Sequence, residues 1–222
     1  MSTRTMSSRA PDPRRRQATA RRRRAGMQIE GIQLLAVILA LMWIVEVINS
    51  LDGQHLNSDG IHARDPGRLW GVLTSPFVHA SFAHLISNTI PLVFMGLIIA
   101  MRGAGRVALV TLIVVVVGGL GTWLIAPGHT STIGASGLVF GYAAYLLTRG
   151  LFDRSLLELL TGMVVAVIWG GALLSSLIPR YGISWQAHAC GAIGGIVAAW
   201  LLSDQRARQR GTSGPPARAL AK

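Results

Sequence analysis

The stretch IGASGLVFGYAAYLLT, residues 133–148, is an apolar helical run that carries a serine near its beginning. At about 1.5 Å per residue, a helix of this length spans about 24 Å, whereas the hydrocarbon core of a bilayer is about 30 Å thick. We therefore expect Ser136 to lie below the membrane surface and residues 127–132 to dip inward. Non-helical backbone at that depth needs surrounding protein or a water-filled cavity. The stretch thus predicts a helical membrane protein with a protected polar site.

Five further apolar segments accompany this one, at about residues 31–49, 83–101, 107–126, 156–178 and 183–202. Hydrophobic residues make up 51% of the chain and charged residues 14%, which is typical of membrane proteins. We predict an all-α polytopic membrane protein, with a bundle of six transmembrane helices formed by residues 27–202. Residues 1–26, rich in arginine, and residues 203–222 are predicted to be disordered cytoplasmic tails. The first apolar run has no small-residue cleavage site, so we expect it to be retained as a span.

Basic residues determine the predicted topology. If the N-terminus is cytoplasmic, 18 of the 21 Lys and Arg residues fall on that side, and only Arg64, Arg68 and Arg180 fall on the other. By the positive-inside rule, both termini are cytoplasmic. We expect a multi-pass plasma-membrane protein whose polar site opens to the extracytoplasmic side.

The net charge of +12 does not by itself indicate a nucleic-acid partner. The nine arginines of the first tail have no aromatic residues among them for stacking on bases, and a span follows directly. Anionic membrane lipid is the expected partner of this tail, and no nucleic acid is expected.

Three polar residues on different segments have similar predicted depths. Counted from the cytoplasmic end of each segment, Ser136, Asn88 and His188 lie about 20, 21 and 24 Å into the membrane. His84 lies one helical turn outward of Asn88 on the same face. Each residue alone could be a helix cap or an interhelical hydrogen-bonding group. Their coincidence at one costly depth indicates a functional site.

These residue types fit hydrolysis by a serine nucleophile. Ser136 would attack, and His188 would take its proton and return one to the leaving amine. The Asn88 amide, a ring N–H of His84 and the backbone N–H of Ser136 could stabilise the oxyanion. Only one acidic residue, Glu46, lies within a span near this depth, and nothing in the sequence links it to His188. We therefore predict a Ser–His dyad.

Glycine spacing favours close packing of the fourth and sixth segments. Gly137 and Gly141 are four residues apart, as are Gly191 and Gly195. Small residues at this spacing let membrane helices approach closely, and a Ser–His hydrogen bond between two helices needs side chains about 3 Å apart.

Further residues bear on the orientation of His188 and on which classes of hydrolase are excluded. Phe140 lies one turn after Ser136 and could pack its ring against His188. The Gly-x-Ser-Gly pattern lacks the glycine spacing and the preceding strand of an α/β-hydrolase nucleophile elbow. No metal or cofactor is expected, because Cys190 is alone and neither metal-ligand spacing nor a phosphate-binding loop is present.

Together these residues resemble a known pattern, that of the rhomboid intramembrane serine proteases in their six-span bacterial form. The matching motifs are His79 with His84-Leu85-Ile86-Ser87-Asn88, Gly134-Ala135-Ser136-Gly137, and Ala187-His188 with Gly191 and Gly195.

The resemblance implies roles for individual residues. Ser136 and His188 would be the catalytic dyad. His84 and Asn88 would stabilise the oxyanion. The residues implied to support the site are Gly134, Gly137, Phe140 and Gly191. Phe140 stands where tyrosine is common in the family, and the Trp-Arg pair found in the first loop of some members is not evident.

The resemblance also implies a class of substrate. Similar enzymes cleave single-span membrane proteins near the outer end of the transmembrane helix, with small residues at the cut. Because helix hydrogen bonds bury the scissile carbonyl, local unwinding must precede attack. The fifth segment, with Gly162, Gly170 and Gly171, is similar to the lateral gate of the family. The stretch 68–82 is similar to the part of the first loop that lies in the outer leaflet.

Two other functions are compatible with parts of the pattern. A catalytically inactive rhomboid-like protein would bind membrane clients, but loss of the serine or the histidine would mark that class. A small transporter or channel would continue its polar residues to the cytoplasmic face, whereas the inner halves of the segments, such as residues 92–100 and 197–202, are apolar. The sequence therefore favours the hydrolase.

Overall fold

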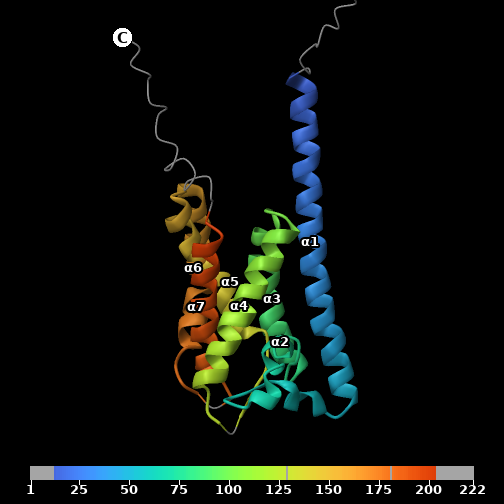
Figure 1. The fold of residues 1–222 in the computed structure, drawn as a ribbon, viewed down its shortest axis with the longest axis vertical. Helices are drawn as coiled ribbons and strands as arrows, with labels where there is room; N and C mark the ends of the chain where they lie inside the picture. Colours follow the sequence, from blue (N-terminus) through green and yellow to red (C-terminus); the bar gives the residue numbers. More distant parts are fainter. Residues whose placement is uncertain (1–12, 129, 181, 204–222) are drawn as a thin grey trace, which may run out of the picture.

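The computed structural model describes residues 13–128, 130–180 and 182–203 of the chain. Within these residues six long helices correspond to the six apolar segments (Figure 1). They are α1 (Pro13–Leu51), α3 (Phe82–Ala100), α4 (Ala104–Ile125), α5 (Ser136–Asp153), α6 (Leu156–Ser175) and α7 (Trp185–Leu201). The predicted all-α polytopic bundle is confirmed.

The six helices are not equally suited to crossing a bilayer. Four of those described, α1, α3, α4 and α6, are long and apolar enough to span a membrane. Helices α5 and α7 have only 18 and 17 residues. They pack against each other and against α4, and residues 138–146 of α5 are all buried. The two short helices therefore lie inside the bundle, where they can hold polar groups away from lipid.

The start of α5 differs from the predicted segment, residues 133–148. Gly134 has a φ of +106°, a conformation that cannot belong to a right-handed helix, so the helix begins at Ser136. At its other end α5 continues to Asp153, because the Arg149 Nε donates to the Asp153 carboxylate at 3.0 Å, one helical turn away.

The N-terminal tail also differs from the prediction. Disorder was expected for residues 1–26, but α1 begins at Pro13. Proline is well tolerated in the first turn of a helix, and the Arg, Ala and Gln residues that follow are good helix formers. The helix is also continuous with a span, so no separate nucleus is needed. Residues 1–12 and 204–222, where disorder was also predicted, lie outside the described residues.

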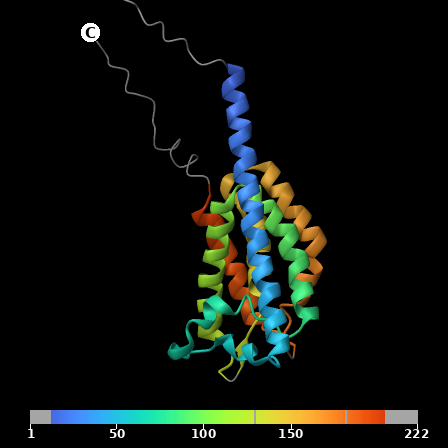
Figure 2. The ribbon, with the colours of Figure 1, turned by 90° about the vertical axis from the view of Figure 1, so that its right-hand side faces the viewer.

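Helix α1 packs along one side of the bundle, against α3 and α4 (Figure 2). A Cβ at Gly31 would meet the carbonyl oxygen of Ala100 at the end of α3. The first turns of α1 project beyond the bundle (Figure 1). The C-terminal end of α7 lies at this same end.

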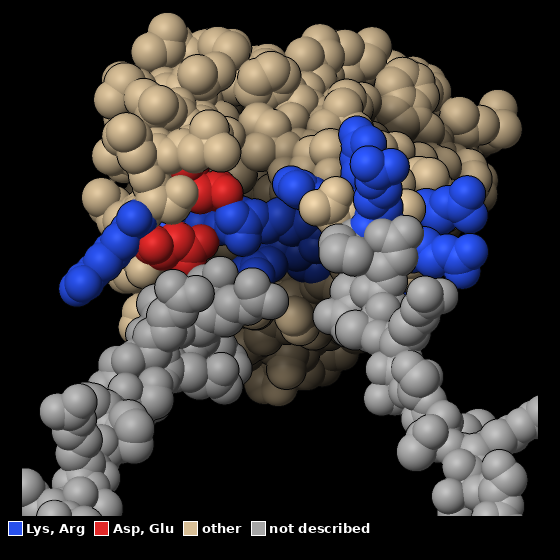
Figure 3. All heavy atoms as spheres, turned by 90° about the horizontal axis from the view of Figure 1, so that it is seen from above, with Lys and Arg blue, Asp and Glu red and all other residues tan. Residues whose placement is uncertain are grey.

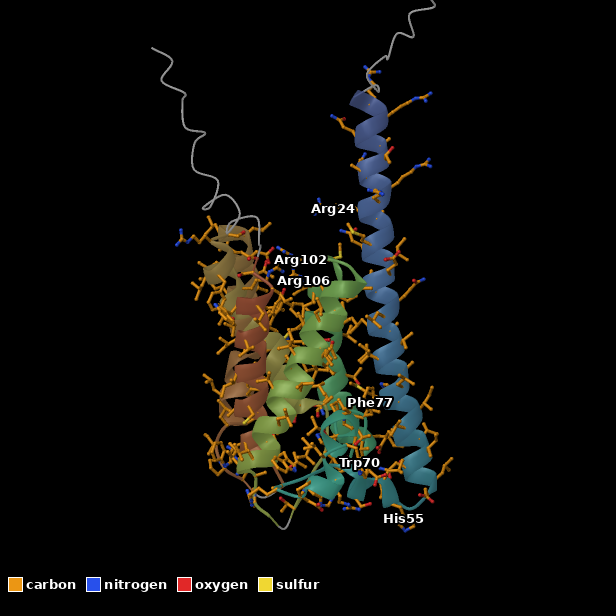
Figure 4. All side chains as sticks on the ribbon, in the orientation of Figure 1. Arg24, His55, Trp70, Phe77, Arg102 and Arg106 are labelled. Atoms are coloured by element: carbon orange, nitrogen blue, oxygen red, sulfur yellow. The ribbon has the colours of Figure 1, made fainter. Side chains whose placement is uncertain are left out.

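Charge is unevenly distributed between the two ends. Arg24, Arg102 and Arg106 lie toward the end where α1 projects, whereas Trp70 and Phe77 lie toward the opposite end (Figure 4). A view onto the first end shows Arg side chains around a few acidic ones (Figure 3).

Ion pairs join the helices at this basic end. The buried Arg149 is bonded to Asp153 and lies 3.4 Å from a carboxylate oxygen of Glu158 on α6. Arg102, which follows α3, pairs with the same glutamate. These contacts connect α6 to α5 and α3 at this end of the bundle.

Loops at the opposite end contain the remaining short elements. They are η1 (His55–Asp59), β1 (Ile61–His62), η2 (Pro66–Arg68), α2 (Gly71–Thr74) and β2 (Ser131–Thr132). Strands β1 and β2 pair antiparallel, with Ile61 opposite Thr132 and His62 opposite Ser131. This ribbon was not predicted. It ties the first loop to the segment that leads into Ser136.

Candidate active site

Ser136 and His188 meet at one end of the central helix pair. Ser136 is the first residue of α5, and His188 lies in the first turns of α7, whose N-cap Ser184 accepts a hydrogen bond from the Ala187 N–H. The Ser136 Oγ lies 2.9 Å from the His188 Nε2. A hydroxyl and an imidazole within hydrogen-bond distance are the arrangement expected of an activated serine.

The second ring nitrogen of His188 determines which tautomer is present. Its Nδ1 lies 2.8 Å from the carbonyl oxygen of Ser176, the residue that caps the end of α6. A carbonyl oxygen can only accept, so the Nδ1 carries the hydrogen and the Nε2 lone pair faces the Ser136 hydroxyl. This is the tautomer that a general base requires. A backbone carbonyl thus takes the place that a carboxylate holds in a Ser-His-Asp triad.

Phe140 fixes the plane of the His188 ring. The two rings are stacked, with centroids 4.3 Å apart and planes inclined by 6°. Phe140 lies one turn after Ser136 on α5 and is 7% exposed. Its ring leaves the imidazole little freedom to rotate away from the serine.

Glycines allow α5 and α7 to touch along their backbones. A Cβ on Gly191 would meet the carbonyl oxygen of Gly137, and one on Gly195 would meet that of Gly141. Both glycine pairs therefore have close neighbours on the facing helix, as their spacing predicted. This contact brings the beginning of α5 close enough to α7 for the Ser136–His188 hydrogen bond.

The loop before Ser136 is held by the first loop of the chain. The Gly134 N–H donates to the Ser75 carbonyl at 2.9 Å, and the Ala135 N–H donates to the His79 Nε2 at 3.2 Å. His79 is fully buried, and burial lowers its pKa to about 4. The imidazole is therefore neutral at pH 7 and can accept this hydrogen bond.

Two side chains of α3 face the backbone next to Ser136. A Cβ built on Gly134 would lie 2.8 Å from the His84 Nε2 and 3.6 Å from the Asn88 Nδ2. Asn88 is 5% exposed, and among the described residues its Nδ2 has no hydrogen-bond partner. An unused amide donor buried beside a nucleophile is suited to donate a hydrogen bond to a developing oxyanion. The N–H of Ser136 itself belongs to the first turn of α5, where no intrahelical partner exists.

A cavity of about 500 Å³ opens at this point. Ser136 and His188 line it together with residues of α3 and α6, among them Pro91, Trp169 and Leu173. It is wide enough for several water molecules and for a few residues of an extended peptide. Among the described residues no group of three or more His, Cys, Asp or Glu side chains is arranged to hold a metal ion.

Two contributors to this site were not predicted from the sequence. One is the Ser176 carbonyl, a group that every residue possesses and that carries no sequence signal. The other is Asn49 of α1, which is fully buried and whose Nδ2 donates to the His79 carbonyl at 3.2 Å and to the Asn57 Oδ1 at 2.9 Å. An amide near the outer end of an apolar run was a detectable signal for this residue.

Comparison with known proteins identifies related chains. The model of the Rhomboid domain family matches residues 66–205. The uncharacterized protein Rv1337 of Mycobacterium tuberculosis is 39% identical over 208 residues, which cover 90% of this chain and 87% of that protein. The putative rhomboid protease YdcA of Bacillus subtilis is 28% identical over 64% of this chain and 72% of its own length. The rhomboid protease GluP of the same species is 32% identical over 64% of this chain, but only 27% of its own length.

Proposed function

The chain belongs to the rhomboid family, and from this premise we propose that it is an intramembrane serine endopeptidase that works by a Ser136–His188 dyad. Family membership supports intramembrane proteolysis in general. The finer assignment depends on one observation, the 2.9 Å hydrogen bond between the Ser136 Oγ and the His188 Nε2 inside an apolar helical bundle.

The proposed reaction has two steps. In the first, the Ser136 Oγ attacks the scissile carbonyl carbon while His188 takes the hydroxyl proton, and the tetrahedral intermediate collapses as His188 protonates the departing amine. In the second, a water molecule attacks the acyl-serine ester, gives a proton to His188, and releases the carboxylic acid while the proton returns to Ser136. The Ser176 carbonyl keeps the imidazole oriented during both steps.

The negative charge of each intermediate would lie beside α3. The unpartnered Asn88 Nδ2, a ring N–H of His84 and the backbone N–H of Ser136 are the donors we assign to it. Donors held in place before the reaction need not reorganise as charge develops, which is why such groups accelerate acyl transfer.

The proposed substrates are single-span membrane proteins. Residues of α3 and of α6 both line the cavity. A substrate segment could therefore reach Ser136 from the lipid between these helices after its own helix has locally unwound. Small residues at the cut, which the resemblance to the family implies, are part of this proposal.

We further propose that the basic end of the bundle faces the cytoplasm of a plasma-membrane protein. Arg24, Arg102 and Arg106 lie toward that end (Figure 4), and it carries 18 of the 21 Lys and Arg residues by the sequence-based topology. The dyad lies at the N-terminal ends of α5 and α7, and so it would open to the extracytoplasmic side. Anionic lipid would be the partner of the arginine-rich tail.

Covalent labelling tests the proposal directly. A fluorophosphonate probe should add one label to the wild-type protein at Ser136, detected by intact mass, and should fail with Ser136→Ala and His188→Ala. Ser58→Ala, which removes an exposed loop hydroxyl, should label like the wild type. The same four proteins should be incubated with model transmembrane substrates, and only the two that label should cleave them. Undiminished labelling of His188→Ala would contradict the dyad, and an unlabelled, inactive wild type would favour the client-binding alternative.

A further inference from the structure

Glu46 is a buried carboxylate that has no role in the proposed Ser136–His188 mechanism. It is the one acidic residue of the apolar run 31–49, and its side chain is fully buried on α1. Its Oε1 accepts a weak hydrogen bond from the Ser50 hydroxyl at 3.4 Å. Its Oε2 is buried, and among the described residues it has no hydrogen-bond partner. A carboxylate in this position is costly, and intramembrane acidic residues are therefore functional candidates.

Neighbours on α1 place Glu46 against the beginning of α3. One turn before it, the Trp43 ring contacts Phe82, with centroids 6.3 Å apart. Three residues after it, the Asn49 amide donates to the His79 carbonyl. Glu46 lies between these two contacts and therefore at the level of the segment from His79 into the first turns of α3.

That segment carries two histidines, whose rings meet edge to face at a centroid distance of 5.1 Å. His79 is already engaged, because its Nε2 accepts the Ala135 N–H and burial holds its pKa at about 4. His84 is the second, and it lies in the first turn of α3, two residues after Phe82, whose ring contacts Trp43 one turn before Glu46. The Nε2 of His84 faces Gly134, next to the nucleophile.

The other charged residues on or next to α1 do not lie beside both Glu46 and the dyad. Asp52 is exposed and lies 3.5 Å from the His55 ring. Helix α4, which also packs against α1, has Arg106 as its charged residue, and this lies toward the opposite end of the bundle (Figure 4). His84 is therefore the partner for Glu46 that also faces the reacting atoms.

We propose that Glu46 is a positioning residue for oxyanion stabilisation, acting through His84. A negative charge on Glu46 stabilises positive charge on the imidazole, which strengthens the His84 N–H as a donor toward an oxyanion beside Gly134 and Ser136. The Glu46 carboxylate thus supports the His84 donor that stabilises the oxyanion, while the Ser176 carbonyl orients the general base His188. This inference rests on the proposed function of Ser136 and His188.

A double-mutant cycle tests the route through His84. Glu46→Gln removes the charge and keeps the size, and it should lower kcat on a model transmembrane substrate about tenfold with KM nearly unchanged. In a His84→Ala background the same substitution should have no further effect. Glu46→Asp, which keeps the charge, should retain most of the activity if Glu46→Gln is too unstable to assay. Glu30→Gln, an exposed position on the same helix, is the matched control and should behave as wild type.

An activity-free measurement separates this inference from the proposed function. Nitrogen NMR of full-length protein with labelled histidines should show the His84 signal titrating at a different pH in Glu46→Gln than in wild type and Glu30→Gln. If no substrate is cleaved but the titration moves, the proposed function fails and the Glu46–His84 coupling stands. An unmoved His84 titration, or an equal loss of kcat in both backgrounds, would overturn the inference and leave Glu46 a structural residue.

Discussion

The His188 Nδ1 lies 2.8 Å from the Ser176 carbonyl oxygen, so the proposed general base is held by the last turn of a different helix. Helix α6 is joined to α5 and α3 by ion pairs at its other end. At the cavity end a Cβ on Gly170 or Gly171 would meet no neighbour within 4 Å. An outward movement of this end would therefore separate the carbonyl from the imidazole. The base is fully oriented only when α6 is packed as in this structure.

Weakening the Ser176 carbonyl as an acceptor should slow catalysis. Replacing Leu177 by its α-hydroxy analogue turns the peptide bond after Ser176 into an ester, whose carbonyl accepts hydrogen bonds poorly. We expect kcat to fall about threefold to tenfold, the value of one hydrogen bond, with KM little changed. The same replacement at Ile178 weakens the Leu177 carbonyl instead and is the matched control. Equal losses in both esters would mean that the His188 contact is unimportant.

Asn88→Ala should reduce turnover without weakening substrate binding. The substitution removes the unpartnered amide donor beside Gly134, and losing one oxyanion donor lowers kcat by up to about 10²–10³. Steady-state kinetics on a model transmembrane substrate would show this. Thr89→Ala is the control, because the Thr89 hydroxyl is bonded to the Leu85 carbonyl within α3. A rise in KM at constant kcat would instead assign Asn88 to substrate docking.

The features that could be predicted are those that depend on the order of apolar and polar residues within one segment of the sequence. Apolar runs predicted six helices, and polar residues at one depth pointed to Ser136, Asn88 and His188. The apolar run begins three residues before α5 does, because the positive φ of Gly134 depends on loop contacts with Ser75 and His79. Such contacts join parts of the chain about 60 residues apart and leave no periodic signal in the sequence.

Two further features could not be predicted from the residues of a single segment. The pairing of Ile61 with Thr132 joins two-residue strands, too short to show an alternation of apolar and polar residues. The hydrogen bond from His188 to Ser176 is accepted by a backbone carbonyl, which every residue has and which the sequence therefore cannot reveal. For Glu46, the sequence showed that a carboxylate lies in a span, but which histidine it faces follows only from how α1 packs on α3.

Phe140→Ala should lower kcat about tenfold, whereas Phe140→Tyr should be close to wild type. The alanine leaves the His188 imidazole without the ring stacked on it at 4.3 Å, so the base is less well oriented. Tyrosine retains the aromatic face. Parallel kinetic measurements, with thermal unfolding in detergent to check folding, would test this. If both variants lost activity equally, the site would require the size of phenylalanine rather than its stacking.

Acid should destabilise the fold through His79. Burial lowers the pKa of this imidazole from 6.5 to about 4, so between these values the unfolded chain binds a proton that the folded chain does not. The contribution of the neutral imidazole is fully present above pH 6.5 and is lost as the pH falls toward 4. It is on the order of 3 kcal/mol. Protonation would also end the acceptance of the Ala135 N–H by the Nε2.

Unfolding in detergent, followed from pH 7 to pH 4, measures this dependence. His79→Gln keeps an acceptor for the Ala135 N–H but cannot be protonated, so its unfolding free energy should fall less over this range. His55→Gln, at an exposed loop position, should follow the wild-type curve. A His79→Gln curve parallel to wild type would assign the acid sensitivity to other groups.

Gly191→Ala should damage both stability and activity, because the new Cβ would meet the Gly137 carbonyl oxygen, a backbone atom that cannot move alone. Forcing α5 and α7 apart costs about 1–3 kcal/mol in a packed interior. It also lengthens the distance from the Ser136 Oγ to the His188 Nε2. Gly105→Ala on α4 is the matched control, since a Cβ there has no neighbour within 4 Å, and it should unfold and cleave like the wild type. Unfolding in detergent and fluorophosphonate labelling rates, measured side by side, would test both. A Gly191→Ala protein that labels at the wild-type rate would show that the dyad does not depend on the close approach of α5 and α7.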